Sequence, residues 1–135
     1  MEKKIIEKLI KKAIIASKNS YSPYSKYSVG AALLTKSGKI FTGTNVENSS
    51  YPAGVCAERT AIFTAVTAGE KEFDALAIFA DGEKLPFPCG ICRQVISEFS
   101  TDLPIIIARN KDDYVVKNIS ELLPHVFEFD LEKIN

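Results

Sequence analysis

The sequence predicts an α/β fold in which helices cover both faces of a mixed β-sheet. The apolar patterns along the chain read, in order, as helix, hairpin, helix, strand, helix, strand, strand and helix. Strands that alternate with helices in the second half favour parallel pairing through right-handed crossovers. A chain of 135 residues, 46% of them hydrophobic and 25% charged, has the size and composition of one soluble domain. We therefore expect residues 1–135 to form a single three-layer α/β/α sandwich.

The N-terminal segment combines an apolar face with many lysines, and it predicts a helix that ends near Asn19. A basic amphipathic helix can bind membranes, but a helix that covers a sheet has the same pattern and is more common. We therefore assign this helix to the core. A hairpin follows, with strands over 29–35 and 39–44, and then a loop over 45–54 rich in Asn, Ser, Pro and Gly. The apolar face of the helix consists of Ile5, Ile6, Leu9, Ile10, Ala13 and Ile14.

The second half of the chain alternates helices with short apolar strands. Helical periodicity runs from Cys56 to Ala68, and Gly69 is a plausible stop signal. The remaining elements are a strand over 75–80, a loop over 81–88, a helix over 90–99, strands over 105–108 and 114–116, and a helical turn over 119–123. The run 105–108 is continuously apolar, which is typical of a strand buried on both faces.

Charge and cysteine content restrict the partners and the compartment. Lys and Arg together number 17, as do Asp and Glu, so no net positive field attracts a nucleic acid. Charged residues interrupt the N-terminal apolar run, and no stretch is long enough to cross a bilayer. Three cysteines are an odd number that argues against a disulfide framework. We expect a cytoplasmic protein without a nucleic-acid or membrane partner.

The three cysteines lie at two predicted loop-to-helix junctions. Cys56 stands at one, and Cys89 and Cys92 form a Cys-x-x-Cys pair at the other. The free N–H groups and partial positive charge of a helix N-terminus stabilise thiolates, which are the form that binds metal. Three thiolates without a fourth good ligand are typical of a catalytic zinc site with one open position. The alternatives are a redox pair, or a closed zinc site completed by Glu58 or His125.

Two charged neighbours of Cys56 fit the chemistry of such a site. A Glu58 carboxylate beside zinc-bound water can take its proton and pass it to a substrate nitrogen, although a Glu here also complements the helix dipole. Zinc with three thiolates carries a charge of about −1, which makes bound water less acidic. Arg59 can offset that charge by donating hydrogen bonds to the sulfurs. Arg93 is either a second such donor or a solvated surface side chain.

The motifs together resemble the small homotetrameric zinc-dependent cytidine deaminase family. The resemblance rests on Cys-Ala-Glu-Arg-Thr-Ala at 56–61, Pro-Cys-Gly-Ile-Cys-Arg-Gln at 88–94, the segment 21–32, Asn45-x-Glu47-Asn48 and Leu-Leu-Pro at 122–124. It covers nearly the whole chain. It implies a five-stranded mixed sheet, one Zn²⁺ per subunit and a homotetramer.

The resemblance also implies an activity, which is hydrolytic deamination of cytidine and deoxycytidine to uridine and deoxyuridine plus ammonia, in pyrimidine salvage. Zinc-activated hydroxide attacks C4 while Glu58 shuttles the protons. A deaminase of a modified nucleoside, of the blasticidin type, and a non-catalytic zinc-binding module are the alternatives. Deamination of a polynucleotide is a third, which the balanced charge disfavours.

The family assigns substrate-binding roles to matching positions. Asn45 and Glu47 bind the sugar 3′-hydroxyl, and the backbone N–H of Ala57 binds the pyrimidine carbonyl. Tyr27 stands near the base, where the family usually has Phe. Tyr51 and Phe127 match residues supplied to a neighbouring subunit's site. A role in the hydrophobic core would explain several aromatic residues equally well, and these are Tyr21, Tyr24, Tyr27, Phe63 and Phe127. Among them we favour a functional role only for Tyr27 and Phe127.

Overall fold

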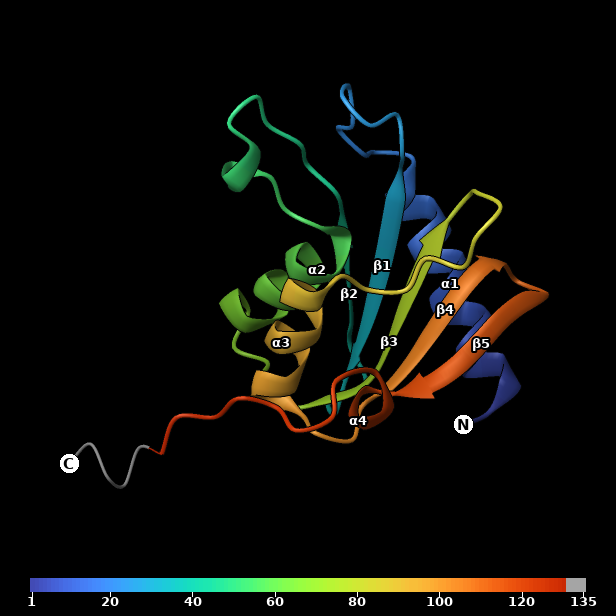
Figure 1. Ribbon diagram of the computed structural model, residues 1–135. Helices are drawn as coiled ribbons and strands as arrows, with labels where there is room; N and C mark the ends of the chain where they lie inside the picture. The colour runs from blue at the N-terminus through green and yellow to red at the C-terminus, as the bar shows by residue number, and fades with distance from the viewer. Residues whose placement is uncertain (131–135) are drawn as a thin grey trace.

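The computed structural model describes residues 1–130, in which five strands form one sheet between helices (Figure 1). In this part of the chain no helix is long and apolar enough to span a membrane. The elements are α1 Lys3–Ser17, β1 Val29–Thr35, β2 Ile40–Thr44, the short 3-10 helix η1 Tyr51–Ala53, α2 Ala57–Thr67, β3 Phe73–Ala80, α3 Gly90–Phe99, β4 Pro104–Asn110, β5 Asp113–Asn118 and α4 Ile119–Leu122.

The strands are arranged in the order β2-β1-β3-β4-β5. The pair β3 and β4, which α3 connects, is parallel, with Ile78 opposite Ile107. The other three pairs are antiparallel. The sheet is therefore mixed, and parallel pairing is confirmed for the strand–helix–strand unit that carries the Cys-x-x-Cys pair.

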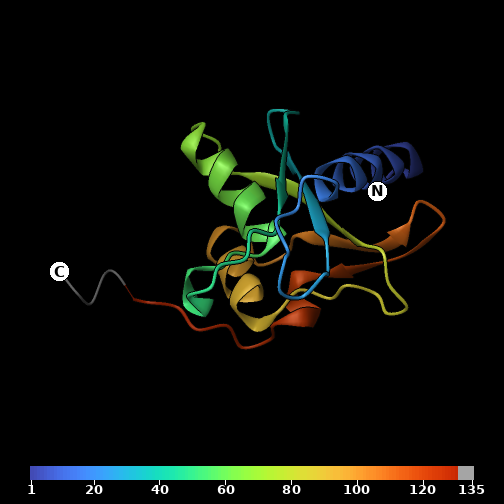
Figure 2. The ribbon, with the colours of Figure 1, turned by 90° about the horizontal axis from the view of Figure 1, so that it is seen from above.

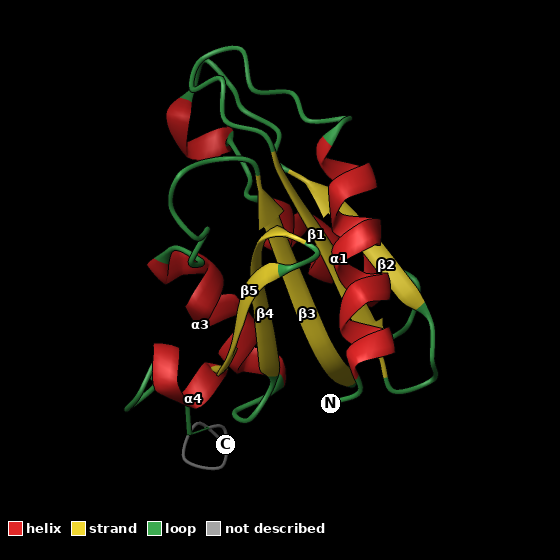
Figure 3. Cartoon of the chain, turned by 90° about the vertical axis from the view of Figure 1, so that its right-hand side faces the viewer, coloured by secondary structure: helices red, strands yellow, loops and turns green. Residues whose placement is uncertain are grey.

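Alternating side chains of the strands build a core on each face of the sheet. Leu33 and Ile107 pack on the side of α2, α3 and α4, whereas Ala32 and Ile106 pack against α1 on the other side. Views along two further directions show α1 and α3 on opposite faces (Figures 2 and 3). The predicted three-layer sandwich is thus confirmed, as is the burial of residues 105–108 on both faces.

Two glycines let the helices lie directly on the sheet backbone. A Cβ at Gly30 would stand 1.8 Å from the carbonyl oxygen of Ala13 in α1. A Cβ at Gly43 would stand 2.3 Å from the backbone nitrogen of Ala61 and 2.6 Å from the carbonyl oxygen of Ala57. The first turn of α2 is therefore fixed against β2, and the position of Cys56 is fixed with it.

The loop that joins α1 to β1 and the loop that joins β2 to α2 gather at one end of the sheet. The segments 20–28 and 45–55 run side by side there (Figure 2), joined by the bridge between Tyr21 and Val46. The same end carries the N-termini of α2 and α3 (Figure 1). The topology thus brings both cysteine clusters and both loops to one place.

Candidate active site

Cys56 and Cys89 occupy equivalent positions at the starts of two helices. Each is an N-cap residue with extended backbone, Cys56 of α2 and Cys89 of α3. Each carbonyl oxygen accepts the first helical hydrogen bond, from Thr60 N at 3.1 Å and from Arg93 N at 3.0 Å. Cys92 lies three residues further into α3 and is fully buried. Both clusters are therefore at helix N-termini, as predicted.

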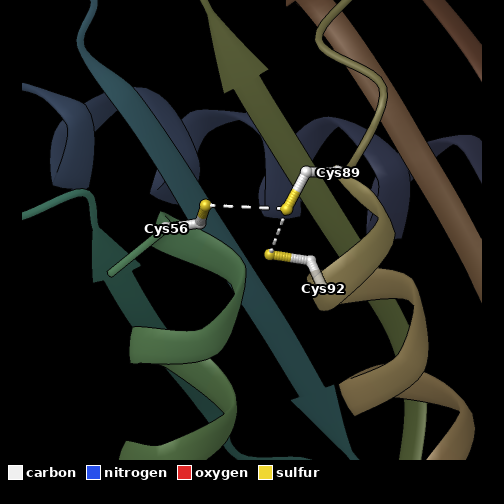
Figure 4. Close-up of side chains that lie close together, drawn as sticks. All are labelled: Cys56, Cys89 and Cys92. Atoms are coloured by element: carbon white, nitrogen blue, oxygen red, sulfur yellow. Dashed lines mark hydrogen bonds between the residues drawn. The ribbon is translucent and has the colours of Figure 1, made fainter. Parts of the chain in front are cut away.

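The three sulfurs point toward one another (Figure 4). The Sγ of Cys89 lies 3.9 Å from that of Cys56 and 3.6 Å from that of Cys92, and all three lie within 4.8 Å of each other. Tetrahedral zinc with bonds of ~2.3 Å would separate its sulfur ligands by about 3.8 Å. The two separations from Cys89 match this spacing, so the cluster suits a zinc ion. His125 lies apart from it, exposed beside α4 in a hollow shared with Ser97 and Pro124.

The electrostatics around Cys56 favour a thiolate. A hydrogen bond from Cys92 and, after it, the guanidinium of Arg59 hold the pKa of Cys56 well below its usual range. The pKa of Cys92 is raised, first by its contact with Cys56 and then by burial, so Cys92 keeps its proton. Arg59 donates from Nη2 to Cys56 Sγ at 3.4 Å. Burial alone would lower the pKa of Arg59, but its hydrogen bonds to Cys56 and Cys92 raise it instead, so its charge is permanent.

Arg93 does neither of the two things that the sequence suggested. Its Nε donates to the carbonyl oxygen of Pro88 and its Nη1 to that of Leu122, both at 2.7 Å. The side chain is half-buried, so it is not a solvated surface residue. Arg93 ties the residue before Cys89 to the end of α4, because its fork of donors reaches backbone on both sides of α3.

Glu58 is the most buried carboxylate among the described residues, with only 4% of its surface exposed. It is the second residue of α2 and lines a cavity together with Cys56 and Cys89. Burial disfavours the charged form and raises the pKa of Glu58 to about 7. A group with that pKa can both accept and donate a proton near neutral pH.

This cavity has a volume of about 450 Å³, which suits a small organic ligand. Its walls are the two loops at the end of the sheet, the start of α2 and the segment before Cys89. Five of the predicted substrate-binding residues line it, and these are Tyr27, Asn45, Glu47, Tyr51 and Ala57. The sixth, Phe127, is elsewhere.

Asn45 and Glu47 hold the neighbouring loop as well as facing the cavity. Asn45 Oδ1 accepts hydrogen bonds from Val29 N, at 3.0 Å, and from the Ser20 hydroxyl, and its Nδ2 donates to Tyr27 O at 2.7 Å. Glu47 accepts hydrogen bonds from residues 24 and 25. The bonds from Ser25 hold the pKa of Glu47 below its usual range, so this carboxylate is charged.

The five aromatic residues for which the sequence also allowed a core position do not lie in the core. Tyr21, Tyr24, Tyr27, Phe63 and Phe127 are all exposed, so the core interpretation is wrong for the single chain. The core on the two faces of the sheet is built from other side chains, mostly aliphatic, and its aromatic members are different residues such as Phe73, Phe79 and Phe99. Tyr51, which is 83% exposed, stands at the cavity rim. Phe127 is 69% exposed beside α3, where Gln94 Nε2 donates to its carbonyl oxygen at 3.2 Å.

Phe87 and Ser25 are among the cavity residues that the sequence analysis did not assign to the site. Phe87 lines the wall just before the Pro88-Cys89 pair, and Ser25 lines it two residues before Tyr27. Proximity to a ligand cysteine was a usable signal for Phe87. Ser25 lies within the segment 21–32 that carries part of the family resemblance, but its contact with Glu47 joins residues 22 positions apart and was not indicated.

Comparisons with known proteins match the whole of this site. Residues 3–108 match the model of the cytidine and deoxycytidylate deaminase zinc-binding region. The chain is 47% identical over 123 residues to a cytidine deaminase of Sporosarcina psychrophila, with 90% of each chain covered. Its fold matches the crystal structure of a cytidine deaminase from Burkholderia pseudomallei with a TM-score of 0.85 at 43% identity, covering 89% of this chain and 97% of the other.

A blasticidin-S deaminase of Bacillus cereus is also similar, at 35% identity over 108 residues, which is 74% of this chain and 76% of the other. The similarity to the Sporosarcina protein is higher in identity and extends over more of the chain.

Proposed function

Because the chain belongs to the cytidine and deoxycytidylate deaminase zinc-binding family, we propose that it hydrolyses cytidine and deoxycytidine to uridine and deoxyuridine with release of ammonia. The resemblance that the sequence motifs suggested is therefore confirmed at the level of the family. The observation that carries the proposal is a cluster of three thiols, two of which line one cavity of nucleoside size together with the buried carboxyl group of Glu58.

We assign one zinc ion per chain to Cys56, Cys89 and Cys92, whose spacing fits it. Bound zinc supplies a water molecule of lowered pKa and an electrostatic stabiliser of negative charge, which hydrolytic deamination needs. Arg59 offsets the charge of the thiolates through its hydrogen bond to Cys56. Arg93 holds the backbone in front of Cys89, which keeps that ligand in place.

Glu58 moves the protons. Its carboxylate would take a proton from the attacking water and deliver it to N3 of the pyrimidine, and would then carry the second proton of the same water to the amino group, which leaves as ammonia. A raised pKa makes both directions accessible at neutral pH, because neither form is strongly favoured. Its burial keeps bulk water away from the proton path.

The remaining cavity residues orient the nucleoside. The N–H of Ala57 belongs to the first turn of α2 and points outward from the helix, so it is a donor for the pyrimidine carbonyl oxygen. Tyr27 offers an aromatic wall to the base. Asn45 Nδ2 carries a second N–H besides the one bound to Tyr27, and Glu47 is a charged acceptor; both suit the sugar 3′-hydroxyl.

The chain assembles, in this proposal, as a homotetramer whose sites are completed across subunits. A shallow apolar hollow on the outer face of α2 is lined by Val55, Phe63 and Thr67, among others, and would be covered by another copy. Phe127 and Phe129 pair edge-to-face at 5.7 Å while both remain exposed. Tyr51 and Phe127 are the residues we assign to a neighbour's cavity. Free thiols that bind zinc are compatible with a cytoplasmic location.

Two other functions are less well supported. A deaminase of a modified nucleoside would also match the family, but Asn45 and Glu47 suit an ordinary sugar and the cytidine deaminase similarity is stronger. A closed zinc module would need a fourth side-chain ligand, but His125 lies in a separate hollow and Glu58 is not part of the group of ligand atoms that lie within 4.8 Å of one another.

The test is the ultraviolet absorbance of cytidine incubated with purified zinc-loaded protein. A fall in absorbance with stoichiometric ammonia supports deamination, whereas unchanged cytidine beside a converted blasticidin-type nucleoside supports the alternative. A count of zinc ligands by X-ray absorption separates a catalytic site, with an oxygen in the fourth position, from a closed one.

A further inference from the structure

The loop from Ser20 to Val29 is held from one side by the segment that contains Asn45 and Glu47. Backbone hydrogen bonds join Tyr21 N to Asn45 O at 3.1 Å and Glu47 N to Tyr21 O at 2.8 Å. The Asn45 side chain then holds the carbonyl of Tyr27 at 2.7 Å. The carboxylate of Glu47 holds the opposite part of the loop, around residue 25. Tyr27 therefore lies between two anchors that belong to the proposed sugar site.

Ser25 is the residue through which the second anchor acts. Its hydroxyl donates to Glu47 Oε2, and its backbone N–H donates to Glu47 Oε1 at 3.1 Å. The same hydroxyl oxygen accepts the N–H of Tyr27 at 3.1 Å. A serine hydroxyl has one hydrogen and two lone pairs, so both contacts form at once. The bond from Tyr27 thus directs the Ser25 hydrogen toward Glu47.

The backbone between these residues is in an unusual conformation. Lys26 has φ of 58°, in the left-handed region that residues other than glycine seldom adopt. Such a conformation persists where surrounding contacts hold it, and here Lys26 N donates to Ser22 O at 3.0 Å while the Ser25 hydroxyl accepts the N–H of Tyr27. The turn is therefore part of the arrangement that aims the Ser25 hydroxyl.

Glu47 has one acceptor position left for a ligand. A carboxylate offers about four acceptor positions, two on each oxygen. Tyr24 N and Ser25 N use both positions on Oε1, and the Ser25 hydroxyl uses one on Oε2. The remaining position is on Oε2, the oxygen that Ser25 binds. The direction of the Ser25 hydroxyl therefore decides where the remaining lone pair points.

We propose that Ser25 is a positioning residue for the nucleoside: its hydroxyl, aimed by the Tyr27 N–H, orients the Glu47 carboxylate toward the sugar 3′-hydroxyl. This inference rests on the proposed function. Ser25 does not contact the reacting atoms, so it acts on binding of substrates that carry a 3′-hydroxyl and leaves the chemical step unchanged.

The experiment compares two substrates that differ only in the 3′-hydroxyl, deoxycytidine and 2′,3′-dideoxycytidine, on the zinc-loaded enzyme. For Ser25→Ala we expect KM for deoxycytidine to rise about 10-fold, as for loss of one hydrogen bond to a charged group, with kcat within about 2-fold. KM for dideoxycytidine should change less than about 2-fold. Ser25→Thr, which keeps the hydroxyl, should restore the KM for deoxycytidine.

Ser22→Ala is the matched control. It removes a hydroxyl from the same loop that contacts Ser20 and Ser28 at 3.1 and 3.4 Å, away from Glu47. We expect both substrates to keep their KM. Thermal unfolding of each variant shows that it is folded, and Ser25→Cys, which has a similar size and a weak donor, replaces Ser25→Ala if that variant does not fold.

The outcomes separate this inference from the function on which it rests. An equal rise of KM for both substrates, or no rise for either, overturns the positioning role, because the effect is then independent of the 3′-hydroxyl. Wild-type protein with no turnover of either nucleoside overturns the proposed function instead.

Discussion

The guanidinium of Arg59 lies 3.4 Å from the sulfur of Cys56, so a permanent positive charge rests against one of the three proposed zinc ligands. Its Nε is buried without a hydrogen-bond partner among residues 1–130, and Nη2 is the atom that donates to the sulfur. This contact gives the first prediction.

Arg59→Gln should lower kcat by about 10–100-fold, the usual effect of removing a partner of a metal ligand. The neutral amide no longer offsets the thiolate charge, so water bound to zinc is less acidic in the variant than in the wild-type enzyme. Steady-state kinetics at full zinc loading measure the effect. Arg109→Gln is the control, because Arg109 forms an ion pair with Asp113, the first residue of β5. Wild-type kcat in Arg59→Gln would contradict the charge argument.

Cys89→Ala should release the zinc. Cys89 Sγ lies 3.9 Å from Cys56 Sγ and 3.6 Å from Cys92 Sγ, so its loss leaves two ligands that no longer enclose the ion. Metal analysis after dialysis at nanomolar free zinc measures retention per chain. Full retention would exclude Cys89 from the ligand set.

The zinc cluster was predictable because two short motifs each fix a helix start, and helix starts are where thiolates are stabilised. The strands were predictable for a similar local reason, since runs such as 105–108 are apolar without interruption. By contrast, β5 was predicted too short. Asp113 and Lys117 belong to it through backbone pairing with β4, which their polar side chains do not reveal.

Contacts between distant loops could not be predicted. The link between Ser25 and Glu47 depends on the path of the chain through the left-handed turn at Lys26, and no propensity of Lys indicates that turn. The contacts of Arg93 could not be predicted for the same reason, since Leu122 is brought to it only by the packing of α4 on α3.

Glu58→Gln should retain the fold and the zinc and lose turnover by ~10²–10⁴ or more, as for removal of a general acid–base group. The amide fills the same buried space but neither accepts nor donates a proton at neutral pH. Turnover of cytidine, with zinc content and thermal unfolding alongside, measures this. Glu70→Gln changes a partly exposed carboxylate that accepts a hydrogen bond from Ser37, and it should be without effect. Near-normal turnover in Glu58→Gln would place the proton path elsewhere.

Cytidine and deoxycytidine should both react, and cytidine monophosphate poorly. The charged side chains that line the cavity are Glu47, Glu58 and Arg59, and Arg59 is engaged with the cysteines. A phosphate near the sugar site would therefore meet the negative charge of Glu47, and Arg59 is the one basic side chain among the described residues that line the cavity. Side-by-side values of kcat/KM for the three substrates decide this, and comparable efficiency on the monophosphate would falsify it.

Assembly gives the last prediction, which is a homotetramer with shared sites. Phe127 lies beside α3 and outside its own chain's cavity, and an exposed pair of aromatic rings is costly unless another surface covers it. Sedimentation at micromolar concentration measures the assembly state. A fully active monomer of 14.9 kDa would exclude shared sites.

If tetramers form, mixing two inactive variants tests the exchange of Phe127 directly. Glu58→Gln chains keep Phe127 but lack the proton carrier, whereas Phe127→Ala chains keep Glu58 and lack the ring. After subunits are unfolded and refolded together, a Phe127→Ala chain beside a Glu58→Gln neighbour receives an intact ring across the interface. Partial activity is therefore expected in the mixture and not in either variant refolded alone. Without such recovery the tetramer would stand, but Phe127 would have no part in the neighbouring cavity.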